Sequence, residues 1–425
     1  MTTPRILRRL APSPTSLWRN RDFNLLWGSQ ALSGLGSSMS SLAYPLLVLF
    51  LTHNAVIAGA VGTVSLLVRV VVRIPAGVLV DRVDRRRLML GCDLIRLVAL
   101  GVLGISLVLG LGSIWIIFAV VAVEGVMSST FEGAAMAAVR NVVPLEQVAI
   151  ATARDEARSY AVSLIGPPAG GGLFAVGRAL PFLADAVSYV LSLIGLLMIR
   201  RPLQERAAGK RSDTSPVRDL VEGLRFTLAS PFLRSSMMIA APLNMSVSGI
   251  MFGIVVLLQQ HGTPAALIGT VETVVGIGGL LGAVAASALL SRFSMSTLIR
   301  GITIAGIPLL LAVLPLSRSP LAAVPMGLLV LLAPALNASL FGHLVAITPD
   351  RLQGRVSSAL ITAAMSLAAF APVVAGALIS HFGARGLVIG FTAIFAVSTV
   401  AALSSRSIRV LGPAGSTVPD PEGSS

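Results

Sequence analysis

Residues 56–110 read VIAGAVGTVSLLVRVVVRIPAGVLV, then DRVDRRR, then LMLGCDLIRLVALGVLGISLVLG. Two apolar runs of more than 20 residues are therefore separated by a turn in which six of seven residues are charged. A helix of about 20 apolar residues crosses the roughly 30 Å hydrocarbon core of a bilayer. The stretch predicts two transmembrane helices, at 56–80 and 88–110, that are joined by a short charged turn.

The composition of the whole chain agrees with this local pattern. Of 425 residues, 55% are hydrophobic and 12% are charged, and the mean hydropathy is +0.88. A soluble chain of this length needs about twice as much charge to cover its surface. Ordinary soluble enzymes and disordered proteins are therefore excluded. The single cysteine, Cys92, also excludes a disulfide-stabilised secreted scaffold.

Twelve runs of membrane-spanning length follow one another along the chain, and they predict an all-α polytopic membrane protein with two pseudo-symmetric six-helix bundles. The predicted spans are 23–51, 56–80, 88–110, 113–138, 153–177, 180–199, 235–259, 265–290, 296–316, 320–345, 356–380 and 386–405. The predicted divisions are an N-terminal segment (1–22), a first bundle (23–199), a basic linker (200–234), a second bundle (235–405) and a disordered tail (406–425).

The net charge of +14 reflects orientation in the membrane rather than nucleic-acid binding, because the arginines cluster at the ends of the apolar runs and aromatic residues are only 5%. With a cytoplasmic N-terminus, all but six of the 32 basic residues lie at the cytoplasmic side. The exceptions are Arg178, Arg318, Arg385, Arg69, Arg73 and Arg96. Both termini are therefore predicted to be cytoplasmic. The first 22 residues lack an apolar core, so no cleavable signal is expected.

The two halves resemble each other weakly. Residues 144–173 align with residues 349–378 at a constant offset, and these segments contain the fifth predicted span of each half. Parallel repeats of this kind are typical of secondary transporters. The identical pairs are Pro144 and Pro349, Pro167 and Pro372, Gly171 and Gly376, and Leu173 and Leu378.

The charged turn contains a recognisable motif. Residues 77–88, GVLVDRVDRRRL, resemble the G-x-L-x-D-R-x-x-R-R-x-L loop of the major facilitator superfamily, although Asp84 stands where that family often has glycine. The resemblance implies the major facilitator fold and a gate that opens and closes at the cytoplasmic face. It implies that Asp81 faces the N-terminal end of the span 356–380. The gate residues are Gly77, Asp81, Arg82, Arg85 and Arg86; an alternative is that the arginines only set orientation.

A second motif lies in the fifth span. Residues 166–171, GPPAGG, look like the GPxxGG element of the superfamily's drug antiporters. Proline interrupts helix hydrogen bonding and glycines allow close helix packing. The motif residues are Gly166, Pro167, Gly170 and Gly171. We expect Gly166, Pro167 and Gly171 to pack this span against the glycines of 265–290, or alternatively the motif to form only a packing kink.

Two longer stretches resemble bacterial drug exporters of the macrolide-efflux and siderophore-export type. They are RNRDFNLLWGSQALSGLGSSMS at 19–40 and AVRNVVPLEQVAIATARDEA at 138–157. Many antiporters of the superfamily carry a basic residue in the fourth span, but residues 120–138 contain none. The proton relay that depends on this basic residue in other antiporters therefore cannot be assigned directly to the fourth span of this chain.

Charged residues inside the spans are the candidates for coupling, because burial of charge in a membrane is costly without a partner or a function. Helical depth places Arg69 and Arg73 level with Glu124 and Glu132, so we expect these to pair in at least one state of the transport cycle, either as a proton-driven switch or as static ion pairs. Asp93 is expected to pair with Arg96, and Asp185 and Glu272 to reach the interface. The acids are Asp93, Glu124, Glu132, Asp185 and Glu272, and the bases are Arg69, Arg73 and Arg96. Polar candidates for the substrate path, or alternatively for helix packing, are Gln30, Asn244 and Asn337.

These features predict a secondary active transporter rather than an enzyme, namely a proton-coupled exporter of amphipathic drugs or metabolites in the cell membrane, with antibiotic resistance as a consequence. Its partners would be a small-molecule substrate and lipid, without nucleic acid, and the protein would be monomeric. No P-loop or metal-ligand cluster is recognisable, so the expected energy source is a proton gradient without a cofactor or metal. The alternatives are a uniporter or importer of a metabolite or lipid-like solute, a polytopic membrane enzyme, and a sensor without flux. The excess of acids over bases in the spans suits cations better than anions.

Overall fold

The computed structural model describes residues 17–204, 222, 225–349 and 352–409, and within them all regular secondary structure is helical. The chain divides into two compact units. Unit 1 contains residues 1–47 and 71–213, and unit 2 contains residues 48–70 and 214–425. The predicted N-terminal segment, basic linker and tail fall largely outside the described residues.

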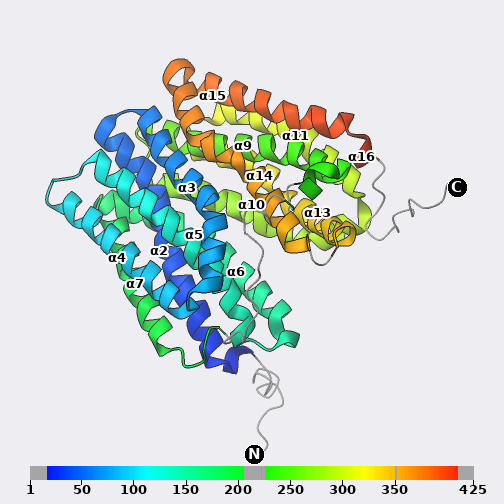
Figure 1. Ribbon diagram of the computed structural model, residues 1–425. Coiled ribbons are helices and arrows are strands. Elements are labelled where there is room, and N and C mark those ends of the chain that lie inside the picture. The colour runs from blue at the N-terminus through cyan, green and yellow to red at the C-terminus, as the bar shows by residue number, and fades with distance from the viewer. Residues whose placement is uncertain (1–16, 205–221, 223–224, 350–351, 410–425) are drawn as a thin grey trace, which may run out of the picture. The chain divides into compact units, whose positions relative to one another are not determined.

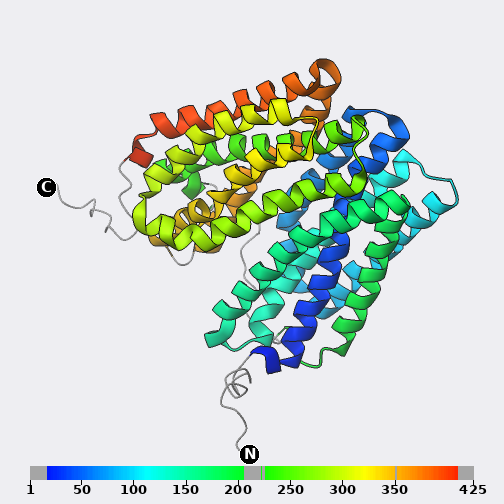
Figure 2. The ribbon, with the colours of Figure 1, turned by 180° about the vertical axis from the view of Figure 1, so that it is seen from behind.

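Unit 1 is built around α2, which lies between α6 and α7 (Figure 2). On the other side of α7, α4 packs against both α7 and α5. The helices are α2 (Arg21–Thr52), α3 (Ala55–Arg82, of which the second part belongs here), α4 (Arg85–Val108), α5 (Ile114–Val142), α6 (Val148–Val176) and α7 (Leu180–Met198), with short 3-10 turns at Leu17–Arg19 and Leu145–Gln147.

In unit 2, α15 packs along both α9 and α11 (Figure 1), and α10 packs against α12 and α13. The helices are α9 (Pro231–Gln260), α10 (Ala265–Arg292), α11 (Met295–Leu316), α12 (Ala323–Leu331), α13 (Ala333–Ile347), α14 (Gln353–Ser366), α15 (Ala371–Ser404) and α16 (Arg406–Arg409). Two 3-10 turns, Pro320–Ala322 and Ala368–Phe370, precede α12 and α15.

The first part of α3 belongs to unit 2 because it crosses α15 at small residues. A Cβ atom at Gly59 would overlap the carbonyl of Pro372, and one at Gly376 would overlap the carbonyl of Ala55. At the same crossing the backbone N–H of Val373 donates to Thr63 Oγ1 over 3.1 Å. Because these glycines have no side chains, the backbones of α3 and α15 can approach closely, as is common for helix pairs in membranes.

Polar residues between the apolar runs determine where several helices begin. The side chain of Asn54 accepts hydrogen bonds from the backbone N–H groups of Val56 and Ile57 at the start of α3. Ser113, Ser230 and Ser294 accept in the same way at the starts of α5, α9 and α11. Such caps satisfy N–H groups that have no partner within the helix.

Ten segments of the described chain are long and apolar enough to cross a membrane. The difference from the twelve predicted runs has two sources. Helix α6 is 29 residues long, but its glycines, prolines and serines dilute its apolar content. Residues 355–404 are counted as one segment of 50 residues, which at 1.5 Å per residue is about 75 Å and exceeds a single crossing.

The chain reverses direction within that long segment. Gly383 has φ 62° and ψ −155°, which is outside the helical region and favours glycine. A Cβ atom at Gly390 would lie 2.9 Å from Leu378 Cδ1, whereas two residues so far apart in a straight helix would be separated by about 18 Å. The predicted run 386–405 is therefore a separate helix after Gly383, whereas the run 356–380 consists of α14, the 3-10 turn at Ala368–Phe370 and the first part of α15.

Each unit has its own hydrophobic core. In unit 1 the core includes Phe23, Leu26 and Phe131, all at most 5% exposed. In unit 2 it includes Leu233, Val356 and Ile408, which are fully buried. The polar site described below lies inside unit 1, so its position depends on the packing of helices within one unit.

Candidate functional site

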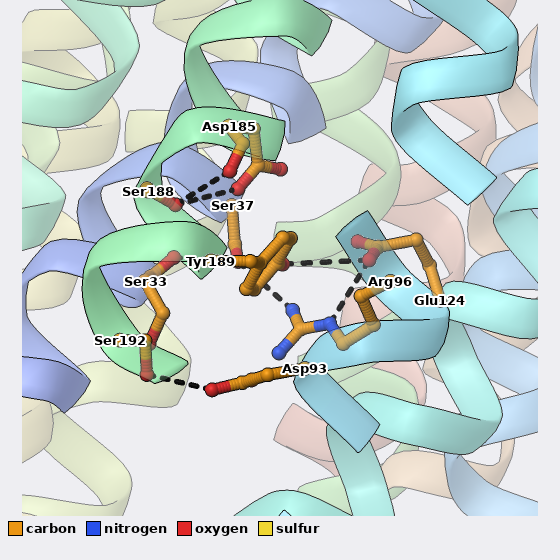
Figure 3. Close-up of polar contacts among 9 residues, drawn as sticks. All are labelled: Ser33, Ser37, Asp93, Arg96, Glu124, Asp185, Ser188, Tyr189 and Ser192. Carbon is orange, nitrogen blue, oxygen red and sulfur yellow. Dashed lines mark hydrogen bonds and ion pairs between the residues drawn. The ribbon is translucent and has the colours of Figure 1, made fainter. Parts of the chain in front are cut away.

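Four helices of unit 1 place ionisable and hydroxyl side chains together in its interior (Figure 3). Arg96 of α4 and Glu124 of α5 form an ion pair, with 2.9 Å between Arg96 Nε and Glu124 Oε1. Their side chains are 5% and 12% exposed, so each charge offsets the cost of burying the other. We define the buried polar cluster as these two residues with Ser37, Asp93, Asp185, Ser188, Tyr189 and Ser192.

Tyr189 of α7 and Ser37 of α2 complete the surroundings of Arg96. The guanidinium carbon lies 4.3 Å from the centre of the Tyr189 ring, which is an attractive cation–π arrangement. Arg96 Nη2 donates to Ser37 Oγ over 2.9 Å, and the hydroxyls of Ser37 and Tyr189 lie 2.8 Å apart. The Tyr189 hydroxyl also donates to Glu124 Oε1 over 3.4 Å. The ion pair is thus held from two further helices.

Two more carboxylates lie on either side of this pair, and both are fully buried. Asp93 Oδ2 accepts a hydrogen bond of 2.6 Å from Ser192 Oγ, and Asp185 Oδ1 accepts one of 3.2 Å from Ser188 Oγ. Within the described part of the chain, the other oxygen of each carboxylate has no hydrogen-bond partner. Neither aspartate has an ion-pair partner among the described residues.

The charges of the buried polar cluster do not balance. Asp93, Glu124 and Asp185 provide three carboxylates, whereas Arg96 provides one guanidinium. Full ionisation would leave an excess of two negative charges in a buried, low-dielectric environment, which is strongly unfavourable. The arrangement is therefore suited to taking up and releasing protons.

The cluster forms in part because two helices, α4 and α7, carry several polar residues at helical spacing. On α7, the residues at 185, 188, 189 and 192 fall on one face (i, i+3, i+4, i+7). Gly36 lets α2 approach this face, since a Cβ atom there would lie 2.9 Å from the Cα atom of Asp185. Tyr189, Ser188 and Ser192 are not among the predicted site residues, although a polar stripe within an apolar run is a usable signal.

Two predictions about these charges are wrong, and a third is not met in this structure. Asp93 does not pair with Arg96 but accepts from Ser192, because the guanidinium turns toward α5. Glu124 pairs here with Arg96, so its pairing with an arginine of α3 in another state of the cycle remains a prediction. Asp185 does not reach an interface, because it points into the unit and is fully buried.

The other three residues for which pairing is predicted are more exposed than Glu124. Arg69, Arg73 and Glu132 all have exposed side chains. The pairing of Glu132 with an arginine of α3 remains a prediction.

Residues of the charged motif at the end of α3 form hydrogen bonds with the neighbouring helices α4, α5 and α7. Helix α3 ends at Arg82, and Asp84 caps α4 by accepting from the backbone N–H of Arg87 over 2.9 Å. Arg85 Nη1 donates to the carbonyl of Ala137 over 3.1 Å, and Arg86 Nη2 donates to the carbonyl of Leu197 over 2.6 Å. These arginines therefore bind carbonyl groups near the C-terminal ends of α5 and α7, where cations are favoured.

The remaining motif residues make fewer contacts. Asp81 and Arg82 have exposed side chains. A Cβ atom at Gly77 would meet nothing within 4 Å in the described structure, so no other helix packs closely against this glycine there. The contact of Asp81 with the helix that follows residue 352 remains a prediction.

The stabilising role of Asp84 as the cap of α4 can be tested by substitution. Replacing Asp84 with alanine should destabilise the protein by about 1 kcal/mol, because the first turn of α4 loses its side-chain acceptor. Thermal unfolding of the purified protein in detergent should show a lower midpoint. Asp84→Ser, which retains an acceptor at the cap, should unfold close to wild type; an equal loss in both variants would mean that capping is not the role of Asp84.

The glycine motif of α6 packs against a different helix from the one expected. A Cβ atom at Gly166 would overlap Ser38, and one at Gly170 would lie 2.6 Å from the carbonyl oxygen of Met39, so both glycines face α2. The glycines of α10 at 278 and 282 meet the backbone of α12 at Gly327 and Leu331. The packing of this motif against α10 would join the two units and remains a prediction. Pro167 and Gly171 are buried.

The three polar candidates for the substrate path have different surroundings. Asn244 Nδ2 donates to the carbonyl of Ala364 over 3.3 Å and so links α9 to α14. Gln30 is half-buried, and its backbone carbonyl accepts from Arg158 Nη1 over 2.9 Å. Asn337 is exposed. The structure therefore gives Asn244 a helix-packing contact and leaves the path roles of Gln30 and Asn337 as predictions.

Comparisons with known proteins give consistent results. The sequence profile of the Major Facilitator Superfamily matches residues 26–372. The multidrug efflux pump Tap of Mycolicibacterium fortuitum is 26% identical over 379 residues, which are 83% of this chain and 87% of that protein. Macrolide efflux protein A of Streptococcus pyogenes is 26% identical over 204 residues, 48% of this chain and 50% of its own length.

Solved structures share the fold at low identity. A bacterial homologue of the human lysosomal transporter Spinster, in an inward-facing unoccupied conformation, superimposes with a TM-score of 0.70 at 16% identity, covering 93% of this chain and 99% of that one. The nucleoside transporter NupG, as its D323A mutant, gives a TM-score of 0.66 at 13% identity, covering 91% and 100%.

Proposed function

The chain belongs to the Major Facilitator Superfamily and is a multi-pass membrane transporter of small molecules, and from this premise we propose that it exports amphipathic compounds in exchange for protons. Transport in this superfamily proceeds by alternating access, in which two six-helix halves rock about the substrate. The proposal therefore needs a group that senses protons within one half.

The buried polar cluster is the observation that carries the proton part of the proposal. It has three carboxylates and one guanidinium, and two of the carboxylates have an oxygen without a hydrogen-bond partner among the described residues. Ionisable residues inside membrane segments that are paired with one another commonly mark proton pathways. Arg96 provides, from the third predicted span, the positive charge that the fourth span lacks.

Protonation of Glu124 would remove the negative charge that holds Arg96 Nε. The guanidinium would then be attracted to the two remaining carboxylates, of which Asp93 is on the same helix at i−3 and therefore on the same face. A change of partner by one buried arginine alters which helices are held together, because Glu124 is on α5 and Asp185 is on α7. Proton binding would in this way bias the conformation of unit 1.

Direction and substrate class rest on the named relatives, which are a multidrug efflux pump and a macrolide efflux protein. We infer export of amphipathic drugs or metabolites, with antibiotic resistance as the cellular consequence. The charge bias of the predicted loops supports a location in the cell membrane with both termini cytoplasmic. The protein would act as a monomer, without a cofactor, metal or nucleic acid.

Transport into proteoliposomes tests this proposal. The purified protein would be reconstituted, a pH gradient imposed in either direction, and the movement of a panel of fluorescent dyes and unlabelled drugs followed. The expected result is accumulation against the substrate gradient that reverses when the pH gradient is reversed and is abolished by a protonophore.

Other outcomes would contradict particular parts of the proposal. Equilibration without accumulation would indicate a uniporter. Accumulation in the same direction as proton flow would indicate an importer. No flux of any compound would contradict the export of amphipathic drugs.

A further inference from the structure

Three serine hydroxyls meet at one end of unit 2, where the start of α9 lies beside the connection between α15 and α16. Ser405 Oγ donates to Ser235 Oγ over 3.0 Å. Ser407 Oγ lies 3.2 Å from Ser235 Oγ and 2.9 Å from Ser405 Oγ. We call these three residues the serine cluster. Each hydroxyl carries one hydrogen that can turn toward an acceptor outside the protein.

The backbone holds the serine cluster in place. Ser405 has an extended conformation (φ −70°, ψ 115°), which ends α15 before α16 begins. Ile408 of α16 is fully buried in the core of unit 2, together with residues from the first turn of α9. Ser407 Oγ also contacts the start of α9, since it donates to the carbonyl of Pro231 over 3.3 Å. The hydroxyls therefore belong to a packed part of the unit.

Two arginines flank these hydroxyls in the sequence. Arg234 precedes Ser235 in the first turn of α9, and Arg406 lies between Ser405 and Ser407; both arginine side chains are exposed. The positive end of the dipole of α9, a helix of 30 residues, lies at the same place. Two guanidinium groups and a helix N-terminus together favour an anion next to the serine cluster.

No carboxylate near these arginines offsets their charge within the described part of unit 2. The acidic residues there are Glu222, which forms an ion pair with Arg355, and Glu272 on α10. Since α9 and α10 are consecutive helices joined by a short turn, the start of α9 and the end of α10 lie at the same end of the unit. Glu272 is half-buried and lies 20 residues before Arg292 at that end, about 30 Å along the helix. Its predicted place at the membrane interface remains a prediction.

Exposed apolar side chains continue from the arginines along both helices. Met238, one turn after Arg234 on α9, is 60% exposed, and Val400 on α15 is 62% exposed. The two lie at a similar level, because Ser398 Oγ on α15 donates to the carbonyl of Ile239 on α9 over 2.8 Å. Both helices are long and apolar enough to cross a membrane. These apolar side chains suit contact with acyl chains, and the arginines then lie toward the headgroups.

The chemistry of the donors specifies the anion. Guanidinium groups and hydroxyls bind the oxygens of a phosphate group through charge-assisted hydrogen bonds. Free phosphate and the headgroup of a phospholipid share this group, but only the lipid also uses the apolar surface that begins one turn away. Basic residues at the ends of membrane helices attract anionic lipids in the same way.

We propose that Arg234, Arg406 and the serine cluster bind the phosphate group of an anionic phospholipid, such as phosphatidylglycerol, at the membrane surface. This inference goes beyond the proposed transport function and does not depend on it. The bound lipid would hold the start of α9 and the end of α15 together through a shared anion.

Binding to the purified protein in detergent tests the inference. Native mass spectrometry would compare phosphatidylglycerol with phosphatidylcholine, which has the same phosphate but no net charge. Wild type should bind phosphatidylglycerol more strongly than phosphatidylcholine. The double variant Arg234→Gln/Arg406→Gln should bind phosphatidylglycerol at least about tenfold more weakly. Ser235→Ala keeps all charges and should bind about threefold more weakly, because one hydroxyl donor is lost.

A matched control separates the site from the general positive charge at this end of unit 2. Arg292→Gln removes an exposed arginine from the same end and should stay within about twofold of wild type. If the double variant does not fold, wild type alone provides the test. Modification of arginines with phenylglyoxal, followed by peptide mass spectrometry, should be slowed at Arg234 and Arg406 by phosphatidylglycerol, but not by phosphatidylcholine, and should be unchanged at Arg292.

Several outcomes would overturn the inference. Equal binding of the two lipids by wild type would show that the anionic headgroup is not selected. An equal loss in Arg292→Gln and in the double variant would mean a diffuse charge effect, and wild-type binding by Ser235→Ala would remove the serine cluster from the site. Displacement of phosphatidylglycerol by an excess of inorganic phosphate would assign the site to free phosphate. A protein that binds the lipid as expected but transports no drug would contradict only the proposed function.

Discussion

Replacement of Arg96 with methionine is expected to destabilise the folded protein by about 3–5 kcal/mol, because it leaves Glu124 buried without a positive charge. The effect should appear as a large fall in the thermal unfolding midpoint in detergent and as poor recovery of monodisperse protein. Glu124→Gln should be milder, since a neutral amide can still accept from Arg96 Nε.

A double variant separates stability from function in this pair. Removal of both charges in Arg96→Met/Glu124→Leu should recover most of the lost stability, because apolar residues of similar volume often replace a buried ion pair without cost. The hydroxyls of Ser37 and Tyr189 keep each other as partners at 2.8 Å. The same double variant should lose transport driven by a pH gradient. Full recovery of transport would mean that the pair is only structural.

Replacement of Gly36 with valine is the second change from which we expect a large effect. The added Cβ atom would overlap the side chains of Asp185 and Ser188 and would lie 2.9 Å from the Cα atom of Asp185. Because a backbone atom is involved, α2 and α7 must move apart. We expect a loss of about 1–3 kcal/mol in stability, typical of overpacking, together with loss of transport, since Ser37 moves away from Arg96 and Tyr189.

The same helix offers a matched control for this substitution. A Cβ atom at Gly28 would meet nothing within 4 Å in the described structure. Gly28→Val should therefore unfold close to wild type and retain transport. If the two variants behave alike, the close approach of α2 to α7 at Gly36 is not required.

The positions of the membrane helices could be predicted from the sequence to within a few residues in most cases. Each helix must present about 20 apolar residues to the bilayer, so its length and hydropathy are local properties. The predicted run at 180–199 and the observed helix Leu180–Met198 illustrate this. Helix α6 begins at Val148, several residues before the predicted 153, because residues 148–152 add a further helical turn before the charged residues at 154–158.

The partners of charged residues could not be predicted in the same way. Helical depth correctly identified Glu124 as a residue that needs a cation, but it could not decide which arginine supplies it. That choice depends on which helices are neighbours, and α4 packs against α5. Arg96 thus reaches Glu124 across this contact, over 2.9 Å.

The same limit applies to the glycines of α6. Their small size predicts a close helix contact, which is observed, but it does not specify the contacting helix. The structure places Gly166 and Gly170 against α2. Tyr189 could have been identified from the spacing of polar residues on α7, because polar groups within a membrane run seldom share one face without a structural or functional reason.

The measurement that tests the central claim most directly compares two modes of transport by Glu124→Gln. Proteoliposomes would be assayed for substrate exchange at equal pH on both sides and for accumulation under an imposed pH gradient. If the buried polar cluster couples protons to transport, the variant should keep substrate exchange. Its accumulation of substrate under the pH gradient should be at least about tenfold lower than that of wild type. Accumulation equal to that of wild type, at equal protein incorporation, would contradict the role of the cluster in coupling.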